Sequence, residues 1–191
     1  ALDGATGAIA EQWPSAMLAG KARSVALDPT GQWLYVLTRD LDRVQSFRVD
    51  HQARSLTPVS TIEAGNDPEE VALDPTGRFL YVSVWSSDEI RAFRVEEGTI
   101  LEPAVSIEAP GNPVKARFSP GGDFALVPLN TADHIATYAI DPQNGALSIV
   151  LPGRNCDDTP LAVGVHRSGR YAYAAVHGGT QDNGHLSSFD F

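Results

Sequence analysis

The chain has 191 residues, of which 42% are hydrophobic and 20% are charged, an ordinary composition for a globular protein with a sizeable core. Its formal net charge of −10 argues against a nucleic-acid-binding or anionic-membrane-binding surface, because both need a basic patch. No apolar run approaches the roughly 18 residues that span a bilayer. Neither nucleic acid nor membrane is therefore expected as a partner.

The two ends and the cysteine content bear on the compartment. Residues 1–9 lack the basic start and apolar centre of a signal peptide, and Ala1 stands where a Met would begin a full-length product, so we expect a processed or excerpted chain. Cys156 is the single cysteine, which rules out an internal disulfide framework. No basic cluster surrounds it to generate a thiolate, so we interpret it as a packed thiol. These features favour the cytoplasm but leave the compartment open.

One sequence pattern returns four times along the chain. It is a turn such as Asp-Pro-Thr-Gly followed, one residue later, by a run such as Trp-Leu-Tyr-Val or Phe-Leu-Tyr-Val. The turns lie at residues 28–31, 74–77, 119–122 and 166–169. Their last glycines are 45 to 47 residues apart. A period of this length indicates one supersecondary unit that is copied and stacked, because a single unit cannot bury its own apolar face.

The second unit shows what each copy contains. Its Asp-Pro-Thr-Gly sequence at residues 74–77 favours a type I turn between the apolar runs 70–73 and 78–84. An alternating run at 89–95 and a fourth run at 104–108 follow. The first two runs are typical of strands buried on both faces, and the third is typical of a strand nearer the rim. Four antiparallel strands in about 46 residues, without a long helix, predict an all-β fold whose units are blades of a β-propeller.

The blade boundaries leave one strand over at each end of this single repeat domain. Residues 3–9 match the link before an outer strand at 141–147, so residues 11–18 are predicted to form an outermost strand without a blade of its own. Residues 185–191 form a third strand whose outer partner is missing. The predicted divisions are an outer closing strand within 1–20 and blades at 21–65, 66–110, 111–152 and 153–191.

The orphan first strand fits the open last blade, and three closures remain open. Two copies could exchange their first strands, forming a homodimer that completes an eight-bladed ring. The chain could belong to a longer propeller. It could also close on itself as a four-bladed ring. In the first two arrangements the end blades expose apolar edges that call for a partner.

Other repeat classes fit less well: leucine-rich repeats are too short, and tetratricopeptide and HEAT units need helices. The WD40 and kelch signatures are absent. The units resemble the Tyr-Val-Thr-Asn-type (YVTN) propeller of the lactonase family, which includes 6-phosphogluconolactonase and the fungal muconate cycloisomerases. The resemblance rests on the turn-and-strand pattern, on Phe-Arg-Val at 47–49 and 93–95, and on residues 141–147. It covers nearly the whole chain and implies a seven-bladed ring in a chain almost twice as long.

In propellers the ligand usually lies at the mouth of the central channel, which gives two sets of candidate positions. Residues entering the innermost strands are Arg23, Glu69, Glu70, Lys115, Leu161 and Ala162. Residues just after the second strands are Arg39, Trp85, Asn130 and His177. A mouth with Arg, Lys, Glu and His can bind a carboxylate or phosphate and move a proton, and lactone opening needs both a base and oxyanion-stabilising groups.

We predict three catalytic residues: His177 or Glu69 as the base, and Arg23 as a cation that holds anionic oxygens. The predicted substrate-binding residues are Arg39, Glu70, Trp85, Lys115 and Asn130. Each has a plainer interpretation as a solvated charge or a blade-edge cap. Family members commonly show Pro-Arg-His and Asn-Glu at the mouth, whereas Ser24 follows Arg23 and Thr131 follows Asn130 here.

No cofactor or metal is expected. The loop at 177–185 offers His177, Asp182 and His185, but three glycines make its frame floppy and a fourth ligand is not evident. No nucleotide-binding glycine loop before a helix and no Gly-x-Ser-x-Gly elbow is present.

Two functions therefore remain. The first is a lactonase-like propeller that hydrolyses or isomerises a small anionic lactone of the sugar-lactone or muconolactone type at the channel mouth. The second is a non-catalytic propeller module for protein or ligand binding, or a structural repeat array, because a fold does not decide a function.

Overall fold

The computed structural model describes residues 12–156, 158–178 and 184–190, and within them the chain is a four-bladed β-propeller. Each blade is a small antiparallel sheet with its strands in chain order. The first sheet contains β1 (Ala22–Leu27), β2 (Trp33–Thr38), β3 (Arg43–Asp50) and β4 (Ser55–Glu63). The second contains β5 (Pro68–Leu73), β6 (Phe79–Val84), β7 (Glu89–Glu96) and β8 (Thr99–Glu108). The third contains β9 (Arg117–Phe118), β10 (Phe124–Leu129), β11 (His134–Ile140) and β12 (Leu147–Asn155). The fourth contains β13 (Pro160–Val165), β14 (Tyr171–Val176) and β15 (His185–Asp190).

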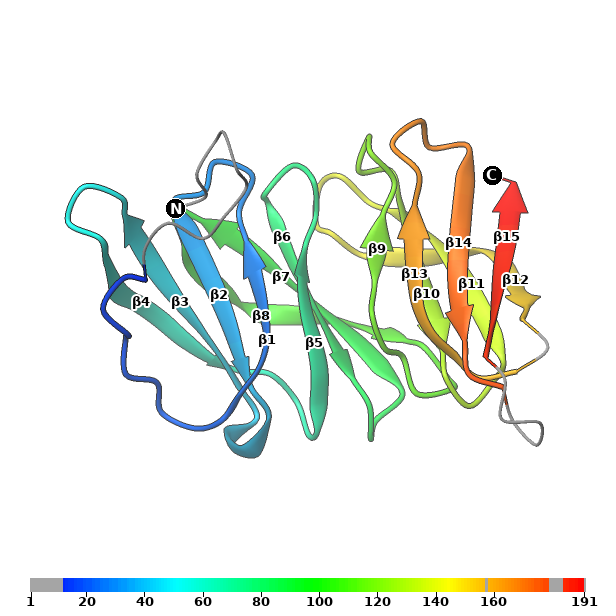
Figure 1. The fold of residues 1–191 in the computed structure, drawn as a ribbon, viewed down its shortest axis with the longest axis horizontal. Coiled ribbons are helices and arrows are strands. Elements are labelled where there is room, and N and C mark those ends of the chain that lie inside the picture. The colour runs from blue at the N-terminus through cyan, green and yellow to red at the C-terminus, as the bar shows by residue number, and fades with distance from the viewer. Residues whose placement is uncertain (1–11, 157, 179–183, 191) are drawn as a thin grey trace.

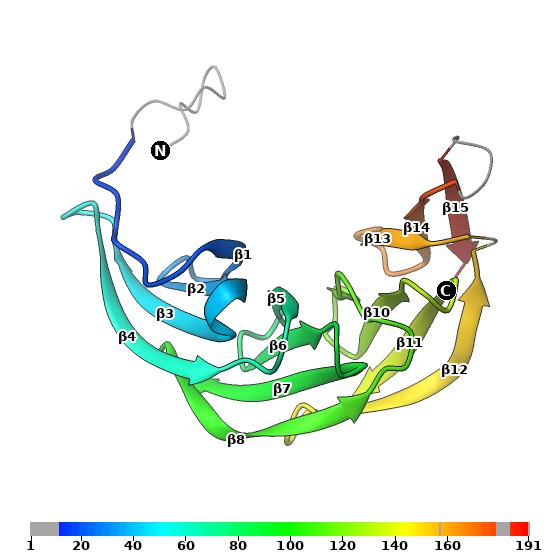
Figure 2. The same cartoon turned by 90° about the horizontal axis from the view of Figure 1, so that it is seen from below.

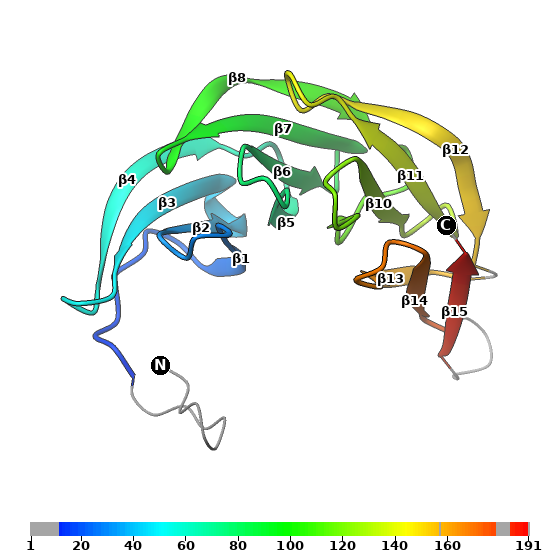
Figure 3. The same cartoon turned by 90° about the horizontal axis from the view of Figure 1, so that it is seen from above.

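The blades stand side by side (Figure 1) and follow one another along an arc. Figure 2 shows the innermost strands β1, β5 and β13 on the concave side and the outer strands β4, β8 and β12 on the convex side. The view from the opposite side shows the first and last blades at the two ends of this arc (Figure 3). The all-β propeller predicted from the repeats is confirmed. Among the described residues, no helix has the length and apolar character needed to cross a membrane.

The repeated turns owe their shape to the side chain of their first residue. The buried carboxylate of Asp74 accepts hydrogen bonds from the backbone N–H groups of Thr76 (3.1 Å), Arg78 (2.9 Å) and Phe79 (2.8 Å). The N–H of Gly77 donates to the carbonyl of Asp74 (3.0 Å), and Gly77 has a φ of 73°, a conformation that glycine adopts without strain. One aspartate thus satisfies the backbone donors of the whole turn before β6 begins.

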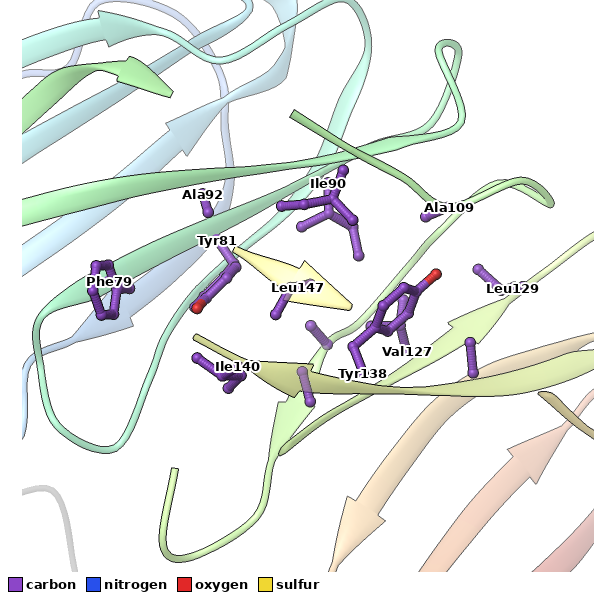
Figure 4. Packing of buried hydrophobic residues seen from close by; sticks show 14 residues of the cluster. Phe79, Tyr81, Ile90, Ala92, Ala109, Val127, Leu129, Tyr138, Ile140 and Leu147 are labelled. Carbon is purple, nitrogen blue, oxygen red and sulfur yellow. The ribbon is translucent and has the colours of Figure 1, made fainter. Parts of the chain in front are cut away.

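Each blade is held to the next by apolar side chains that alternate along its strands. Figure 4 shows the cluster between blades 2 and 3, where Phe79 and Tyr81 of β6 face Tyr138 and Ile140 of β11. The hydroxyl of Tyr81 donates to the carbonyl of Gly145 at 2.9 Å. Because successive residues of a strand point to opposite faces, Leu80, Val82 and Val84 of β6 pack toward blade 1. The core is therefore a series of interfaces between blades.

The fourth strand of blade 2 begins earlier than its sequence indicates. The apolar run starts at residue 104, whereas β8 starts at Thr99. Glu97 and Gly98, both with positive φ, make a tight turn that brings Ile100 opposite Val95. Pro103 does not interrupt the strand because it lies where the ladder between β7 and β8 shifts register, a position that spares its missing N–H.

The two ends of the chain leave the closure undecided. Residues 12–18 are not in a strand, and residues 1–11 lie outside the described residues. The predicted outermost strand and its exchange between two copies therefore stay predictions. The fourth sheet has three strands among the described residues, with β15 at its outer edge. Cys156 is buried, as expected for a packed thiol.

Candidate functional site

A cavity of about 400 Å³ lies where the innermost strands of the four blades begin. The antiparallel ladders place the start of each first strand beside the end of the second, as in the pairs Ala22–Thr38, Pro68–Val84 and Pro160–Val176. The two sets of rim positions chosen from the sequence therefore meet at one end of the propeller. The lining residues are Arg23, Arg39, Glu69, Trp85, Val114, Lys115, Asn130 and Leu161.

Glu69 joins the arginines of blade 1 to blade 2. Its Oε1 accepts a hydrogen bond from Arg23, and its Oε2 accepts one from Nη1 of Arg39 at 3.2 Å. The side chain of Glu69 is 12% exposed, whereas those of Arg23 and Arg39 are 46% and 40% exposed. Both oxygens of the carboxylate are thus engaged by guanidinium groups, and the two arginines are held side by side at the cavity wall.

Asp67 completes this network from the link that precedes β5. Nε of Arg39 donates to Oδ1 of Asp67 at 2.5 Å. This hydrogen bond stabilises the charged forms of both groups. It therefore lowers the pKa of Asp67 below its ordinary value and raises the pKa of Arg39 above its ordinary value. Asp67 was not among the site residues predicted from the sequence. Its signal is the Asp-Pro pair at 67–68, which marks the turn into the inner strand.

The third blade contributes Lys115 and Asn130, whose loops are organised by Asn112. The amide of Asn112 donates to the carbonyl of Trp85 at 2.8 Å, and its Oδ1 accepts from the hydroxyl of Thr131 at 2.7 Å. The carbonyl of Asn112 accepts from the N–H of Asn130 at 3.2 Å. Sequence reasoning also missed this residue, although Asn-Pro at 112–113 repeats the Asp-Pro signal one blade later.

Glu70 does not line the cavity. Its carboxylate accepts from Nη1 of Arg117 at 3.1 and 3.3 Å, which ties blade 2 to blade 3. Burial raises the pKa of Glu70 above its ordinary value of 4.5, although Arg117 acts in the opposite direction. Its geometry is that of an interblade contact, and its predicted substrate-binding role stays a prediction.

His177 follows β14 at the position that corresponds to Arg39, Trp85 and Asn130 in the other blades. Its side chain is exposed and is not among the residues that line the cavity. The backbone N–H of His177 donates to the backbone carbonyl of Thr159 at 2.9 Å. Asp182 lies outside the described residues. Within the described ranges, no group of three or more His, Cys, Asp or Glu side chains could hold a metal ion.

A family model described as lactonase, 7-bladed β-propeller, matches residues 58–156, which is just over half of the chain. The chain belongs to this lactonase family. All four strands of blade 2 and all four strands of blade 3 fall within the match, together with the end of β4. No curated protein sequence shows significant similarity to this member of the family.

Several solved structures share the fold of this lactonase-family chain. The periplasmic gluconolactonase of Pseudomonas aeruginosa superposes with a TM-score of 0.74 at 19% identity, over 100% of this chain and 62% of that one. A candidate 6-phosphogluconolactonase of Bacteroides uniformis gives 0.71 at 18% identity, over 88% of this chain and 55% of that one. The hydrazine synthase of Kuenenia stuttgartiensis gives 0.72 at 19% identity, over 94% of this chain and 49% of that one.

These similarities concern the fold. The chain spans between 49% and 62% of the length of the three structures. Proteins named for lactone hydrolysis and for hydrazine synthesis share the architecture, so the assignment of an activity must rest on the side chains at the cavity.

Proposed function

We propose that the cavity binds a small anionic lactone and opens its ring by hydrolysis. The observation that carries this proposal is the charge at the cavity. Arg23, Arg39 and Lys115 line it together with one carboxylate, that of Glu69, in a chain whose formal net charge is −10. A local excess of positive charge on an acidic protein favours an anionic ligand at that place.

The remaining lining residues fit the neutral part of such a ligand. A volume of about 400 Å³ falls within the range of small-molecule sites. Trp85 offers an aromatic face for a sugar ring, and Asn130 offers an amide that can both donate and accept hydrogen bonds. Val114 and Leu161 provide apolar wall. The class of ligand supported is therefore a phosphorylated or carboxylated sugar lactone, or a muconolactone.

In the proposed reaction, water adds to the carbonyl carbon and the bond from that carbon to the ring oxygen breaks. The water proton passes through a base to the departing ring oxygen, which becomes a hydroxyl group. Arg23, Arg39 and Lys115 stabilise the substrate anion and the oxyanion that forms during attack. Glu69 positions the two arginines, because both of its oxygens already accept hydrogen bonds from them.

His177 is kept as the proposed base, although it does not line the cavity, because it follows β14 at the rim position that corresponds to Arg39, Trp85 and Asn130, which do line it. Glu69 would have to release an arginine before it could accept a proton, whereas the imidazole of His177 is exposed on the fourth blade. A neutral imidazole has a ring nitrogen that can accept a proton, which suits general-base catalysis.

The test is a pH-indicator assay of acid release from 6-phosphogluconolactone, gluconolactone and muconolactone. We expect Lys115→Ala to lower kcat/KM for the anionic lactones about tenfold or more, and His177→Ala to lower kcat about 100-fold. Arg94→Ala is the matched control, because Arg94 pairs with Glu96 on β7, away from the cavity. Rates at the uncatalysed background for all three lactones would contradict hydrolysis.

A second function is favoured by one feature of the site. Glu69 is the lining residue with a carboxylate, and both of its oxygens are engaged by arginines. The cavity would then bind an anion without turnover. Calorimetric titration with 6-phosphogluconate distinguishes the two, because binding that Lys115→Ala weakens, combined with background hydrolysis, supports a binding module.

A further inference from the structure

A second cavity, of about 640 Å³, lies between blades 2 and 3, where β8 of blade 2 faces β11 and β12 of blade 3. It shares no lining residue with the cavity at the starts of the innermost strands. Blades 2 and 3 each have four strands, and all residues of this wall are among the described ones. The cavity therefore does not depend on how the end blades are completed. Its volume falls within the range of small-molecule sites.

A small side chain on β11 opens this space. Gln45, Arg91 and Ala136 take equivalent positions, because each pairs with the fourth residue of the second strand of its blade. Arg91 lines the corresponding cavity beside blade 1, which has a volume of about 370 Å³, and pairs there with Glu89 at 2.8 Å. In blade 3 the side chain of Ala136 ends at Cβ, so the space that Arg91 fills in blade 2 is left open.

Tyr138 brings a hydroxyl to this wall. Phe47, Phe93 and Tyr138 take equivalent positions in the third strands, opposite the second residue of the preceding strand, and they are 2%, 1% and 2% exposed. Blade 3 thus has a phenol where blades 1 and 2 have a phenyl ring. Figure 4 shows the hydroxyl of Tyr138 on the side of Leu129, another residue that lines the cavity.

The hydroxyl of Tyr138 has no hydrogen-bond partner within the part of the chain that the structure describes. In that same part, every side-chain oxygen that is wholly enclosed does have a partner. The hydroxyl must therefore reach accessible space, and the cavity is the accessible space that Tyr138 lines. Because an unpaired hydroxyl on a buried residue costs stability, a ligand oxygen that pairs with it would bind favourably.

The proton of this hydroxyl is retained at neutral pH. Burial raises the pKa of Tyr138 above its ordinary value of 10.0, since it disfavours the phenolate. A protonated phenol can both donate and accept a hydrogen bond, so it can pair with either a hydroxyl or a carbonyl oxygen.

The rest of the wall favours a neutral ligand with an apolar body. Its side chains include neither Lys nor Arg, and its carboxylate is that of Glu108. Nδ1 of His134 donates to the carbonyl of Ala132, which leaves Nε2 of the neutral imidazole as an acceptor. The apolar side chains of the wall include Val105, Ile107, Leu129, Leu147 and Ile149.

We propose that the cavity between blades 2 and 3 binds a neutral small molecule with an apolar body and one hydroxyl or carbonyl oxygen, which pairs with the hydroxyl of Tyr138. The apolar wall covers the body of this molecule, and Glu108 repels an anion. The ligand thus differs in charge from the anionic lactone proposed for the other cavity. The two sites are independent, so the failure of one proposal leaves the other standing.

The test is equilibrium dialysis of the full chain against 1-naphthol, naphthalene and 1-naphthoate. These probes share an apolar ring body and differ in their oxygen group and charge. We expect 1-naphthoate to bind about tenfold more weakly than 1-naphthol or worse, because its charge finds no cation in the wall. An excess of 6-phosphogluconate should not displace 1-naphthol.

Tyr138→Phe isolates the hydroxyl, and it should fold because phenylalanine stands at this position in blades 1 and 2. We expect it to weaken the binding of 1-naphthol about tenfold and to change that of naphthalene less than about twofold. Tyr173→Phe is the matched control, since it removes a hydroxyl from an exposed tyrosine of β14 outside the cavity. It should leave the binding of both probes unchanged.

Ala136→Gln provides a second variant, which fills the cavity with the residue that blade 1 carries at this position. It should weaken the binding of 1-naphthol and of naphthalene about tenfold or more. Three results would overturn the proposal: no binding of 1-naphthol to the unaltered chain, equal binding of 1-naphthol to Tyr138→Phe, or displacement of 1-naphthol by 6-phosphogluconate. The last result would mean that the probe occupies the cavity at the innermost strands.

Discussion

Glu69 and Glu70 are neighbours in one strand, and the alternation of β5 places them in opposite surroundings. Glu69 faces the cavity and holds two arginines of blade 1, whereas Glu70 is buried against Arg117 of blade 3. A pair of adjacent acids thus ties blade 2 to both of its neighbours. The two carboxylates should differ in their effects on stability, because Glu69 accepts hydrogen bonds from two arginines and Glu70 from one, and burial raises the pKa of Glu70.

Glu70→Gln tests that difference through its pH dependence. Burial raises the pKa of Glu70 in the folded protein above 4.5, so the folded state binds this proton more tightly than the unfolded state. Between the unfolded and folded pKa values, rising pH therefore lowers the stability of the unaltered protein, and the glutamine variant lacks this loss. We expect the free energy of unfolding of Glu70→Gln, relative to the unaltered protein, to increase as the pH rises from about 4.5 toward neutrality. Urea titrations at several pH values measure it.

Glu96→Gln is the control for this comparison, since it removes the same charge from an exposed position on β7. A relative stability of Glu70→Gln that stays constant with pH, or that decreases as the pH rises, contradicts the assignment of a raised pKa.

The rim residues could be predicted from the sequence, but their partners could not. The position in the repeat was enough to predict Arg23, Arg39 and Lys115 as rim residues, because each follows or precedes a strand at a fixed distance from the turn glycine. The pairing of Glu69 with two arginines depends on how far apart neighbouring blades stand and on the rotamers at their interface. Neither quantity is contained in the periodicity of one chain.

At the level of elements, the turn before each second strand is the unit that the sequence specifies most completely. The carboxylate of Asp74 accepts from several backbone donors, whereas among the described residues the hydroxyl of Ser119, at the same place in blade 3, accepts from the N–H of Phe124 at 3.1 Å. The turn before a second strand therefore tolerates fewer hydrogen bonds to its first side chain when the flanking strands are otherwise well packed.

Asp74→Ala should destabilise the protein by about 2–3 kcal/mol, because the N–H of Phe79 and its neighbours lose a charged acceptor. Asp74→Ser should cost less, since a hydroxyl at this position retains one hydrogen bond, as Ser119 does. Chemical denaturation measures both. Asp123→Ala, at an exposed aspartate of the next turn, should lie within about 0.5 kcal/mol of the unaltered protein. Equal losses for Asp74→Ala and Asp123→Ala would show that the carboxylate network does not stabilise the turn.

The strands that the sequence predicted less well are those whose pairing is irregular. The start of β8 was missed because Glu102-Pro103 reads as a break, although Pro103 lies at a register shift that accommodates it. β9 is only two residues long, and the chain before it pairs with β10 through an isolated bridge between Pro113 and Leu129. Local residue preferences do not report such compensation by a neighbouring strand.

At the scale of the molecule, the burial of the strands differs between the centre of the arc and its ends. All six residues of β6 are buried, because blades pack on both of its faces. In β14 buried and exposed residues alternate, because one face packs on blade 3 and the other carries Tyr171 and Tyr173. The period of the repeat predicted the blades, but a period does not specify how the end faces are covered.

In a repeat protein each unit gains stability from its neighbours, so units with one neighbour open more easily than units with two. We therefore expect the amide hydrogens of β6 to exchange with solvent most slowly. Those of β14 should exchange about tenfold faster or more when the chain is dilute enough to be monomeric. Hydrogen exchange followed by mass spectrometry of peptides that cover the two strands measures the ratio.

Raising the protein concentration separates the two sources of protection. If a second copy covers the fourth blade, the exchange of β14 and β15 should slow as the dimer forms, while β6, which already has a blade on each face, should change little. Equal protection of β6 and β14 in the dilute chain would contradict the dependence of each blade on its neighbours. Protection of β14 that is independent of concentration, with the gradient intact, would leave that dependence standing and count against coverage by a second copy.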